Sequence, residues 1–278
     1  MTIQMSGGRN GAHRATSILW GDGVSVRFEI LGRLRVVDGD GSSTPSAHKV
    51  GILLTALLIR ANQVVSTSQL IGEIWGQDPP RRATAALHVY VSQLRKFLKR
   101  PGEDGVIVTR PPGYMLQIPC GDLDLNTFRR LLYQGRNQIR EQRYGAAVTS
   151  LQTAAELVRD EEIVGSGPIV GGFTSWLAEV RLECAEMRIE SSLALGRHRE
   201  LVSVLQTLIS EHPLHEAFYR QLMLALYRSD RRADALQVYQ GVRSMLDAEL
   251  ALEPCASLRD LHRAILLADE RLQLRAAG

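Results

Sequence analysis

The chain of 278 residues is poor in cysteine and in aromatic side chains. Its three cysteines, Cys120, Cys184 and Cys255, lie far apart and form no C-x-x-C pair. This spacing argues against a structural zinc site and against a disulfide framework, so we expect reduced thiols in a cytoplasmic protein. No apolar run reaches the roughly 18 residues that a membrane-spanning helix needs, and we expect no membrane segment.

The sequence also lacks the short motifs of common enzyme classes. A phosphate-binding P-loop needs Gly-Lys followed by Ser or Thr, but none of the three lysines, Lys49, Lys96 and Lys99, follows a glycine. The H-E-x-x-H, G-x-S-x-G and EF-hand patterns are absent, and no His/Cys spacing fits a metal site. We therefore predict a binding protein without catalytic residues, metal or cofactor.

The charge is distributed unevenly along the chain. Residues 25–119 hold 12 Lys/Arg and 7 Asp/Glu, whereas residues 120–278 hold 19 Lys/Arg and 22 Asp/Glu. A basic first half and a mildly acidic second half suggest two domains, one suited to nucleic acid and one to protein contact. Residues 1–24 lack the apolar region of a signal peptide and are expected to form a disordered tail.

An amphipathic helix is predicted over Asp78–Lys99. Asp78 is suited to cap it, and Pro79 and Pro80 suit a first helical turn. Four apolar residues recur at i, i+4, i+7 and i+11 and should form a buried face. These residues are Leu87, Val91, Leu94 and Leu98.

The rest of this helix carries short polar, amide and cationic side chains, which are the groups that contact a DNA groove. Arg and Gln hydrogen-bond base edges, Val touches a thymine methyl group, and Lys neutralises phosphate. The candidate DNA contacts are Arg81, Arg82, His88, Val89, Ser92, Gln93, Arg95, Lys96 and Lys99. The helix alone fits equally well a core helix with a solvated basic face.

A short hairpin follows the helix. Val106 and Val108 begin one strand, Tyr114–Ile118 forms the other, and Arg110-Pro111-Pro112-Gly113 makes the turn. A two-stranded wing behind a basic helix is typical of a winged helix-turn-helix that reads duplex DNA. Arg110 and Tyr114 are therefore further candidate DNA contacts, although in a purely structural hairpin Arg110 would only be solvated.

The segment before the helix completes this fold. Residues 26–36 alternate as two strands, residues 38–41 form a turn, and residues 49–60 read as a buried helix. Val64-Val65 is a short strand, and Ser66 or Thr67 should cap a second helix that ends near Trp75. This order is that of the winged-helix output domains of bacterial response regulators.

The second half contains a helical repeat. The pattern Leu201-Val202-x-x-Leu205-Gln206 recurs 34 residues later, which is the tetratricopeptide period. An earlier copy at Ala147 lies 54 residues upstream, as if Asp160–Thr174 were a Gly-rich insertion. We expect a stack of helix pairs with a concave binding surface, although a helical domain that only supports dimerisation fits nearly as well.

Combined motifs resemble the Streptomyces antibiotic regulatory protein family. They are FEILGRLRVVDGDG, LLTALLIRANQVVSTSQLIGEIWGQDPP, ALHVYVSQLRKFL and VTRPPGYMLQI, followed by a second half similar to the family's bacterial transcriptional activation domain. The resemblance implies an activator of a pathway-specific biosynthetic gene cluster. It also implies that tandem or dimeric protomers bind direct repeats in double-stranded DNA near the promoter −35 element.

The resemblance implies further site residues. The turn containing Gly76, Gln77, Asp78 and Pro79 would meet RNA polymerase holoenzyme, at its sigma factor and neighbouring subunits. The family often opens its first long helix with K-x-R, which suits phosphate contact. Here His48-Lys49-Val50-Gly51 retains only one such cation, Lys49.

We therefore expect an α+β winged helix-turn-helix of the response-regulator output type, followed by an all-α tetratricopeptide-like domain. The expected boundaries are a tail over 1–24, the DNA-binding domain over 25–120 and the activation domain over 121–278. Two other functions fit the same sequence: an interaction adaptor whose winged helix no longer binds DNA, and a repressor that shares the DNA-binding mode.

Overall fold

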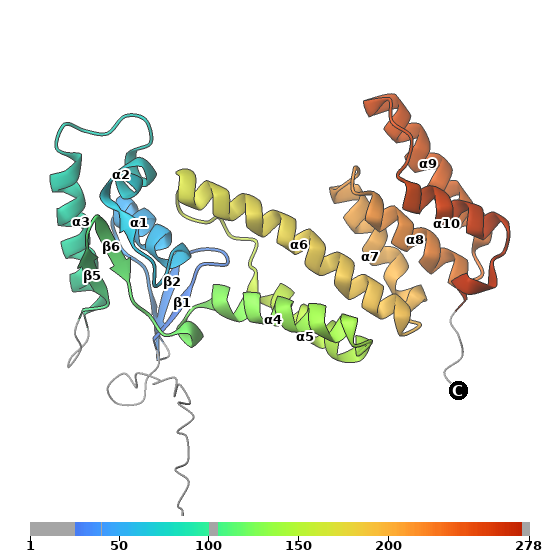
Figure 1. Ribbon diagram of the computed structural model, residues 1–278, viewed down its shortest axis with the longest axis horizontal. Helices are drawn as coiled ribbons and strands as arrows, with labels where there is room; N and C mark the ends of the chain where they lie inside the picture. Colours follow the sequence, from blue (N-terminus) through green and yellow to red (C-terminus); the bar gives the residue numbers. More distant parts are fainter. Residues whose placement is uncertain (1–25, 40, 100–104, 274–278) are drawn as a thin grey trace, which may run out of the picture. The chain divides into compact units, whose positions relative to one another are not determined.

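The computed structural model describes residues 26–39, 41–99 and 105–273, and Figure 1 draws its elements. The chain forms two compact units. The first comprises the described residues up to Ile30, with Leu34–Leu123 and Val164–Gly167, and the second comprises Leu31–Arg33, Asp124–Ile163 and the chain from Pro168 onward. The tail expected over 1–24 lies outside the described residues.

The first unit opens with a three-stranded antiparallel sheet. Its strands are β1 (Val26–Glu29), β2 (Arg35–Asp38) and β3 (Gly41–Ser43), in the order β1-β2-β3. The first two strands confirm the alternation of apolar residues, since Val26, Phe28 and Val36 are buried. The sequence analysis missed β3 because its three residues are all exposed and carry no apolar pattern.

Three helices follow the sheet. They are α1 (His48–Ile59), α2 (Thr67–Trp75) and α3 (Ala83–Leu98). Every residue of α1 from Val50 to Leu58 is buried, so this helix forms the centre of the unit. Ser66 caps α2 as predicted, because its hydroxyl accepts from the Gln69 N–H while the Gln69 side chain accepts from the Ser66 N–H.

The predicted start of α3 was wrong. The helix begins at Ala83 after Arg82, which makes no side-chain cap, and Asp78 lies five residues upstream. The cause is local, because Asp78 and Pro79 each precede a proline and are forced away from the helical region. The predicted buried face is confirmed, with Leu87, Val91, Leu94 and Leu98 each at most 5% exposed.

The wing has three strands rather than the two that were predicted. The strands are β4 (Val65–Ser66), β5 (Ile107–Arg110) and β6 (Gly113–Leu116), in the order β4-β6-β5. β4 pairs Val65 with Tyr114 and Ser66 with Gly113, which are distant in sequence. A two-residue strand carries too little pattern for such a long-range pairing to be predicted.

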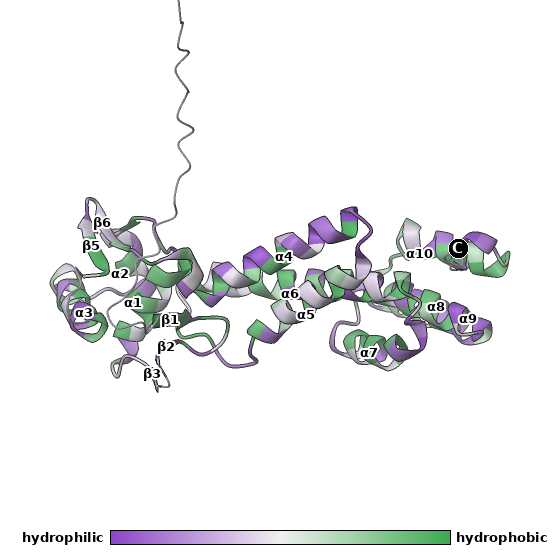
Figure 2. Cartoon of the chain, turned by 90° about the horizontal axis from the view of Figure 1, so that it is seen from below, coloured by the Kyte–Doolittle hydropathy of each residue, from purple (hydrophilic) through white to green (hydrophobic). Residues whose placement is uncertain are grey.

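The second unit is all helical, as predicted. Its helices are α4 (Asp124–Arg140), α5 (Tyr144–Leu157), α6 (Pro168–Ala194), α7 (His198–Glu211), α8 (Glu216–Arg228), α9 (Arg232–Leu250) and α10 (Ala256–Leu266). Short 3₁₀ turns cover Cys120–Asp122, in the first unit, and Glu270–Leu272. In Figure 2 the outer side of α4 is a hydrophilic stripe, opposite its buried Leu125, Phe128 and Leu132.

The 34-residue repeat seen in the sequence corresponds to two helices of the second unit. Helix α7 begins at His198 and α9 at Arg232, and the repeated residues Leu205 and Tyr239 are both buried. The insertion predicted over Asp160–Thr174 is only partly a loop, because α6 already begins at Pro168. Proline suits a first helical turn. The buried Phe173 ring stacks on Trp176 with ring centres 5.7 Å apart, and this contact stabilises the start of α6 despite the glycines at 171 and 172.

Candidate nucleic-acid interface

The outer face of α3 is exposed, polar and cationic. This face lies opposite the buried stripe, so the helix period places it in solvent. The predicted contacts on the helix and in the turn before it are all exposed: Arg81, Arg82, His88, Val89, Ser92, Gln93, Arg95, Lys96 and Lys99. Val89 is 53% exposed on this face and could contact a thymine methyl group there.

The side chain of Arg95 forms two hydrogen bonds with strand β5 of the wing. Its Nε donates to the carbonyl oxygen of Ile107 over 3.1 Å, and its Nη2 donates to the hydroxyl of Thr109 over 2.8 Å. These two hydrogen bonds join the last turn of α3 to β5. The guanidinium of Arg95 thus positions the wing, and its predicted contact with phosphate stays a prediction.

Tyr114 does not present a contact surface. Its side chain is buried at 7% exposure in β6, beneath His88 and Arg95. The His88 ring stands edge-on to Tyr114 at 6.5 Å, and the Arg95 guanidinium lies 6.0 Å from the ring centre. The ring of Tyr114 thus supports the exposed His88 from inside the domain, and the predicted DNA contact of Tyr114 stays a prediction.

The wing turn is fixed to the start of α2. The backbone N–H and the hydroxyl of Thr67 both donate to the carbonyl oxygen of Pro112, each over 3.1 Å. Gly113 approaches β4 so closely that an added Cβ would lie 1.9 Å from the carbonyl oxygen of Val65. Arg110, at the end of β5, is exposed beside this fixed turn.

The other flank of α3 carries an aromatic stack. Trp75, at the end of α2, stacks on Tyr90 with ring centres 5.7 Å apart, and the Lys49 ammonium lies 5.2 Å from the Trp75 ring centre. Lys49 is thus held beside the α2–α3 turn rather than on the outer face of α3. Gly76 follows directly with φ of +61°, a conformation that glycine tolerates best.

The predicted residues therefore fall into three groups within the first unit. The outer face of α3 holds Val89, Ser92, Gln93 and Lys96, the wing side holds His88, Arg95 and Arg110, and Lys49 lies beside the exposed turn of Gly76, Gln77, Asp78 and Pro79. Thr67 was predicted only as a possible helix cap, not as a contact of the wing turn, and Thr109 and Tyr90 were not predicted as part of the site. Of these, only Tyr90 left a sequence signal, as an aromatic residue on the flank of an amphipathic helix.

Two family models match the chain. The model described as "Transcriptional regulatory protein, C terminal" covers residues 44–116, which includes α1, α2, α3 and the wing. The model described as "Bacterial transcriptional activator domain" covers residues 123–266. Together they span most of the described chain.

Relatives match across both units. Regulatory protein DnrI of Streptomyces peucetius is 33% identical over 254 residues, which are 88% of this chain and 93% of DnrI. Regulatory protein AfsR of Streptomyces griseus is 35% identical over 249 residues, 89% of this chain and 25% of AfsR. This chain thus spans about a quarter of the length of AfsR.

A solved structure has the same fold. Mycobacterium tuberculosis EmbR, solved in complex with a low-affinity phosphopeptide, superimposes with a TM-score of 0.84 at 31% sequence identity. The match covers 88% of this chain and 66% of the EmbR chain. Over the ranges that the structure describes, no helix is both long and apolar enough to cross a membrane.

Proposed function

The chain belongs to the Streptomyces antibiotic regulatory protein family of transcriptional activators, and we propose that it binds direct repeats near the −35 element of a biosynthetic gene cluster and recruits RNA polymerase there. It acts in the cytoplasm, as tandem or dimeric protomers on double-stranded DNA. The family consists of transcription regulators rather than enzymes.

One observation carries the DNA-binding part of this proposal: an exposed strip of α3 combines base-reading and phosphate-binding side chains. His88, Val89, Ser92 and Gln93 are exposed on the same helix as Lys96. We assign the first four to base edges and thymine methyl groups, and Lys96 to phosphate.

Flanking cations extend the contact to the DNA backbone. Arg81 and Arg82 precede the N-terminus of α3, where no acidic residue stands in the first turn, so the helix dipole and both cations favour phosphate. Lys99 follows its C-terminus, and Arg110 reaches outward from the wing. We assign these side chains to phosphate or minor-groove contacts, with Arg95 and Tyr114 holding the wing in place.

The polymerase contact is assigned to the turn of Gly76, Gln77, Asp78 and Pro79. All four residues are exposed, and the Lys49–Trp75–Tyr90 stack anchors the start of the turn. Two prolines, Pro79 and Pro80, restrict the end of it. A rigid, exposed turn outside the outer face of α3 remains free for a protein partner while α3 lies in the groove.

Binding of labelled duplex DNA by the full chain across a salt series tests this proposal. We expect Lys96→Ala to weaken binding to all sequences and to lower the slope of log affinity against log salt by about one unit. The matched control is Arg27→Ala, which removes an exposed cation from β1. A chain that binds no duplex DNA would favour the adaptor function, and binding that reduces transcription in a reconstituted assay would favour the repressor.

A further inference from the structure

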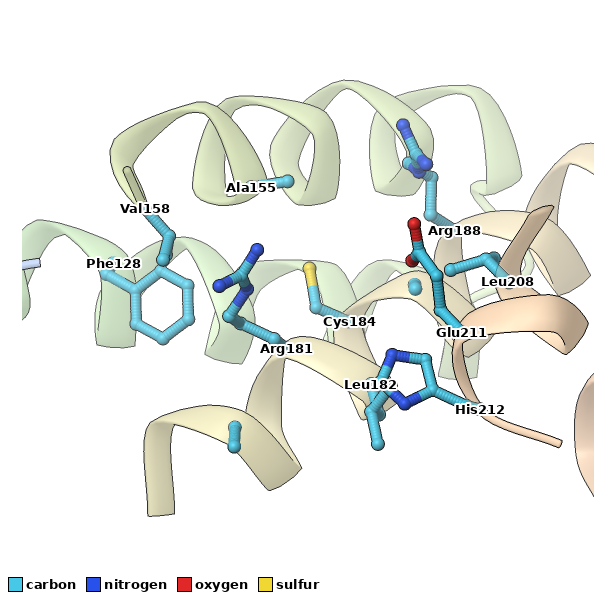
Figure 3. Close-up of a pocket in the computed structure, with 12 residues that line it drawn as sticks. Phe128, Ala155, Val158, Arg181, Leu182, Cys184, Arg188, Leu208, Glu211 and His212 are labelled. Carbon is cyan, nitrogen blue, oxygen red and sulfur yellow. The ribbon is translucent and has the colours of Figure 1, made fainter. Parts of the chain in front are cut away.

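A cavity of about 350 Å³ lies within the helical unit, between α4, α5, α6 and α7. Figure 3 shows its lining, with the side chains of Phe128 and Val158 at one end and those of Leu208, Glu211 and His212 at the other. Its volume falls within the range of pockets that bind small molecules, which begins at roughly 300 Å³. Neither the winged helix nor the polymerase-binding turn contributes to it.

Helix α6 contributes half of the residues that line the cavity. One side of α6 lines it through Ala178, Arg181, Leu182, Ala185 and Arg188, which recur at helical intervals. Alanines at two of these positions leave space that larger side chains would fill. The repeat spacing grows from 34 to 54 residues across the junction between α5 and α6, and α6 is the longer helix there, at Pro168–Ala194.

The lining combines an apolar floor with cations. Phe128 is 1% exposed, and Leu182, Leu208 and Val158 are half-buried at other positions of the lining. Two arginines reach the cavity against one acidic residue, Glu211. This arrangement suits a ligand with an apolar body and an anionic end.

The two arginines differ in their partners. Arg181 forms an ion pair with Asp160 over 2.8 Å, which offsets its charge. Arg188 donates instead to the amide oxygen of Gln152, a neutral acceptor. The guanidinium of Arg188 therefore keeps its charge for a ligand and has its orientation fixed by Gln152, which favours bidentate binding of a carboxylate.

Cys184, at the floor, contributes shape rather than reactivity. Its thiol is buried and donates to the carbonyl oxygen of Leu151 over 3.4 Å. Burial raises the pKa of this thiol to about 11, so it stays protonated at neutral pH. The thiol of Cys184 is therefore a poor nucleophile at neutral pH.

We propose that this cavity binds a small organic acid, with its carboxylate on Arg188 and its aliphatic or aromatic body against Phe128, Leu182 and Leu208. The site is independent of the DNA-binding proposal, because its residues all belong to the helical unit. A bound acid would contact α4, α6 and α7 together and stabilise their arrangement.

Calorimetric titration of the full chain with three probes of equal length tests this assignment: octanoate, octan-1-ol and octylamine. We expect saturable 1:1 binding of octanoate, with an affinity about tenfold above that of the alcohol, because a charge-assisted hydrogen bond to Arg188 is lost in the alcohol. Octylamine should bind most weakly. Absence of saturable octanoate binding, or equal binding of octylamine, would overturn the proposal.

Two variants with matched controls locate the site. Arg188→Met should weaken octanoate binding about tenfold, whereas Arg199→Met, at an exposed arginine of α7 outside the cavity, should leave it unchanged.

Ala178→Trp should fill the cavity and abolish binding, and Ala248→Trp on α9 serves as its control. Thermal unfolding of each variant establishes that it folds, and undiminished octanoate binding by folded Ala178→Trp would place the ligand elsewhere.

Discussion

The guanidinium of Arg95 on α3 donates to the hydroxyl oxygen of Thr109 on β5 over 2.8 Å. With the second bond to the carbonyl of Ile107, this contact fixes the angle between the helix that we assign to the major groove and the wing beside it. Arg95, which the sequence suggests as a phosphate contact, therefore holds the wing against α3 in the structure.

Arg95→Lys separates these two roles, because lysine keeps the charge but lacks the planar fork that makes both hydrogen bonds. We expect Arg95→Lys to lose DNA affinity nearly as strongly as Arg95→Ala. Its free energy of unfolding should fall by about 0.5–1.5 kcal/mol for each hydrogen bond lost. Denaturant unfolding and duplex binding at one salt concentration measure both quantities, and wild-type affinity of Arg95→Lys would restore Arg95 as a phosphate contact.

Arg110 should behave differently from Arg95. It lies exposed at the end of β5, and its side chain forms no hydrogen bond or ion pair with any other residue that the structure describes. We expect Arg110→Ala to lower DNA affinity while the free energy of unfolding changes by less than about 0.5 kcal/mol. A stability loss that matches the affinity loss would make Arg110 a structural residue of the wing.

Gly113 is required by the close approach of two strands. A Cβ at this position would lie 1.9 Å from the carbonyl oxygen of Val65, so Gly113→Ala must displace β4 or β6. We expect a loss of about 1–3 kcal/mol in the free energy of unfolding. Gly72→Ala is the control, since an added Cβ there meets nothing within 4 Å inside α2, and it should stabilise by about 0.5–1 kcal/mol. Equal stability of Gly113→Ala and wild type in denaturant unfolding would contradict the observed strand pairing.

Periodicity predicted the parts of the fold that local pattern controls. The buried stripe of α3 and the 34-residue repeat of the helical unit followed from residue spacing. The cap of α2 was predicted at Ser66 or Thr67 from residue type, and the structure places it at Ser66. The start of α3 was misjudged because proline at a first helical turn was weighed above its effect on the preceding residue, Asp78. β3 was missed because its three exposed residues carry no apolar pattern. The place of β4 in the wing was missed because it pairs with β6, which is distant in sequence.

The sequence was enough to predict which residues of the candidate site are exposed, but not which other residues they contact. The sequence placed His88 and Gln93 on the correct side of α3, because a helical period fixes which residues leave the core. It could not reveal that Arg95 reaches Thr109 or that Tyr114 turns inward, since both depend on how the wing packs on α3. Partners across a tertiary contact leave no periodic signal.

Gln77 tests the separation of DNA binding from activation. It is exposed in the turn after Trp75 and lies outside α3. We expect Gln77→Ala to keep most of the DNA affinity and to lower transcription from the target promoter in a single-round assay. Full activation by Gln77→Ala, and also by the charged variant Gln77→Lys, would remove this turn from the polymerase interface.

The central claim is that the outer face of α3 reads base edges, and the base preference of Gln93→Ala tests it most directly. Selection from a randomised duplex library gives the preference of the wild-type chain and of the variant at every position of the site. We predict that Gln93→Ala loses discrimination at one base pair, by about 1–3 kcal/mol, and keeps the remaining preferences. Lys96→Ala should weaken binding yet retain the whole preference profile. An unchanged profile for Gln93→Ala would contradict the assignment of this face to the major groove.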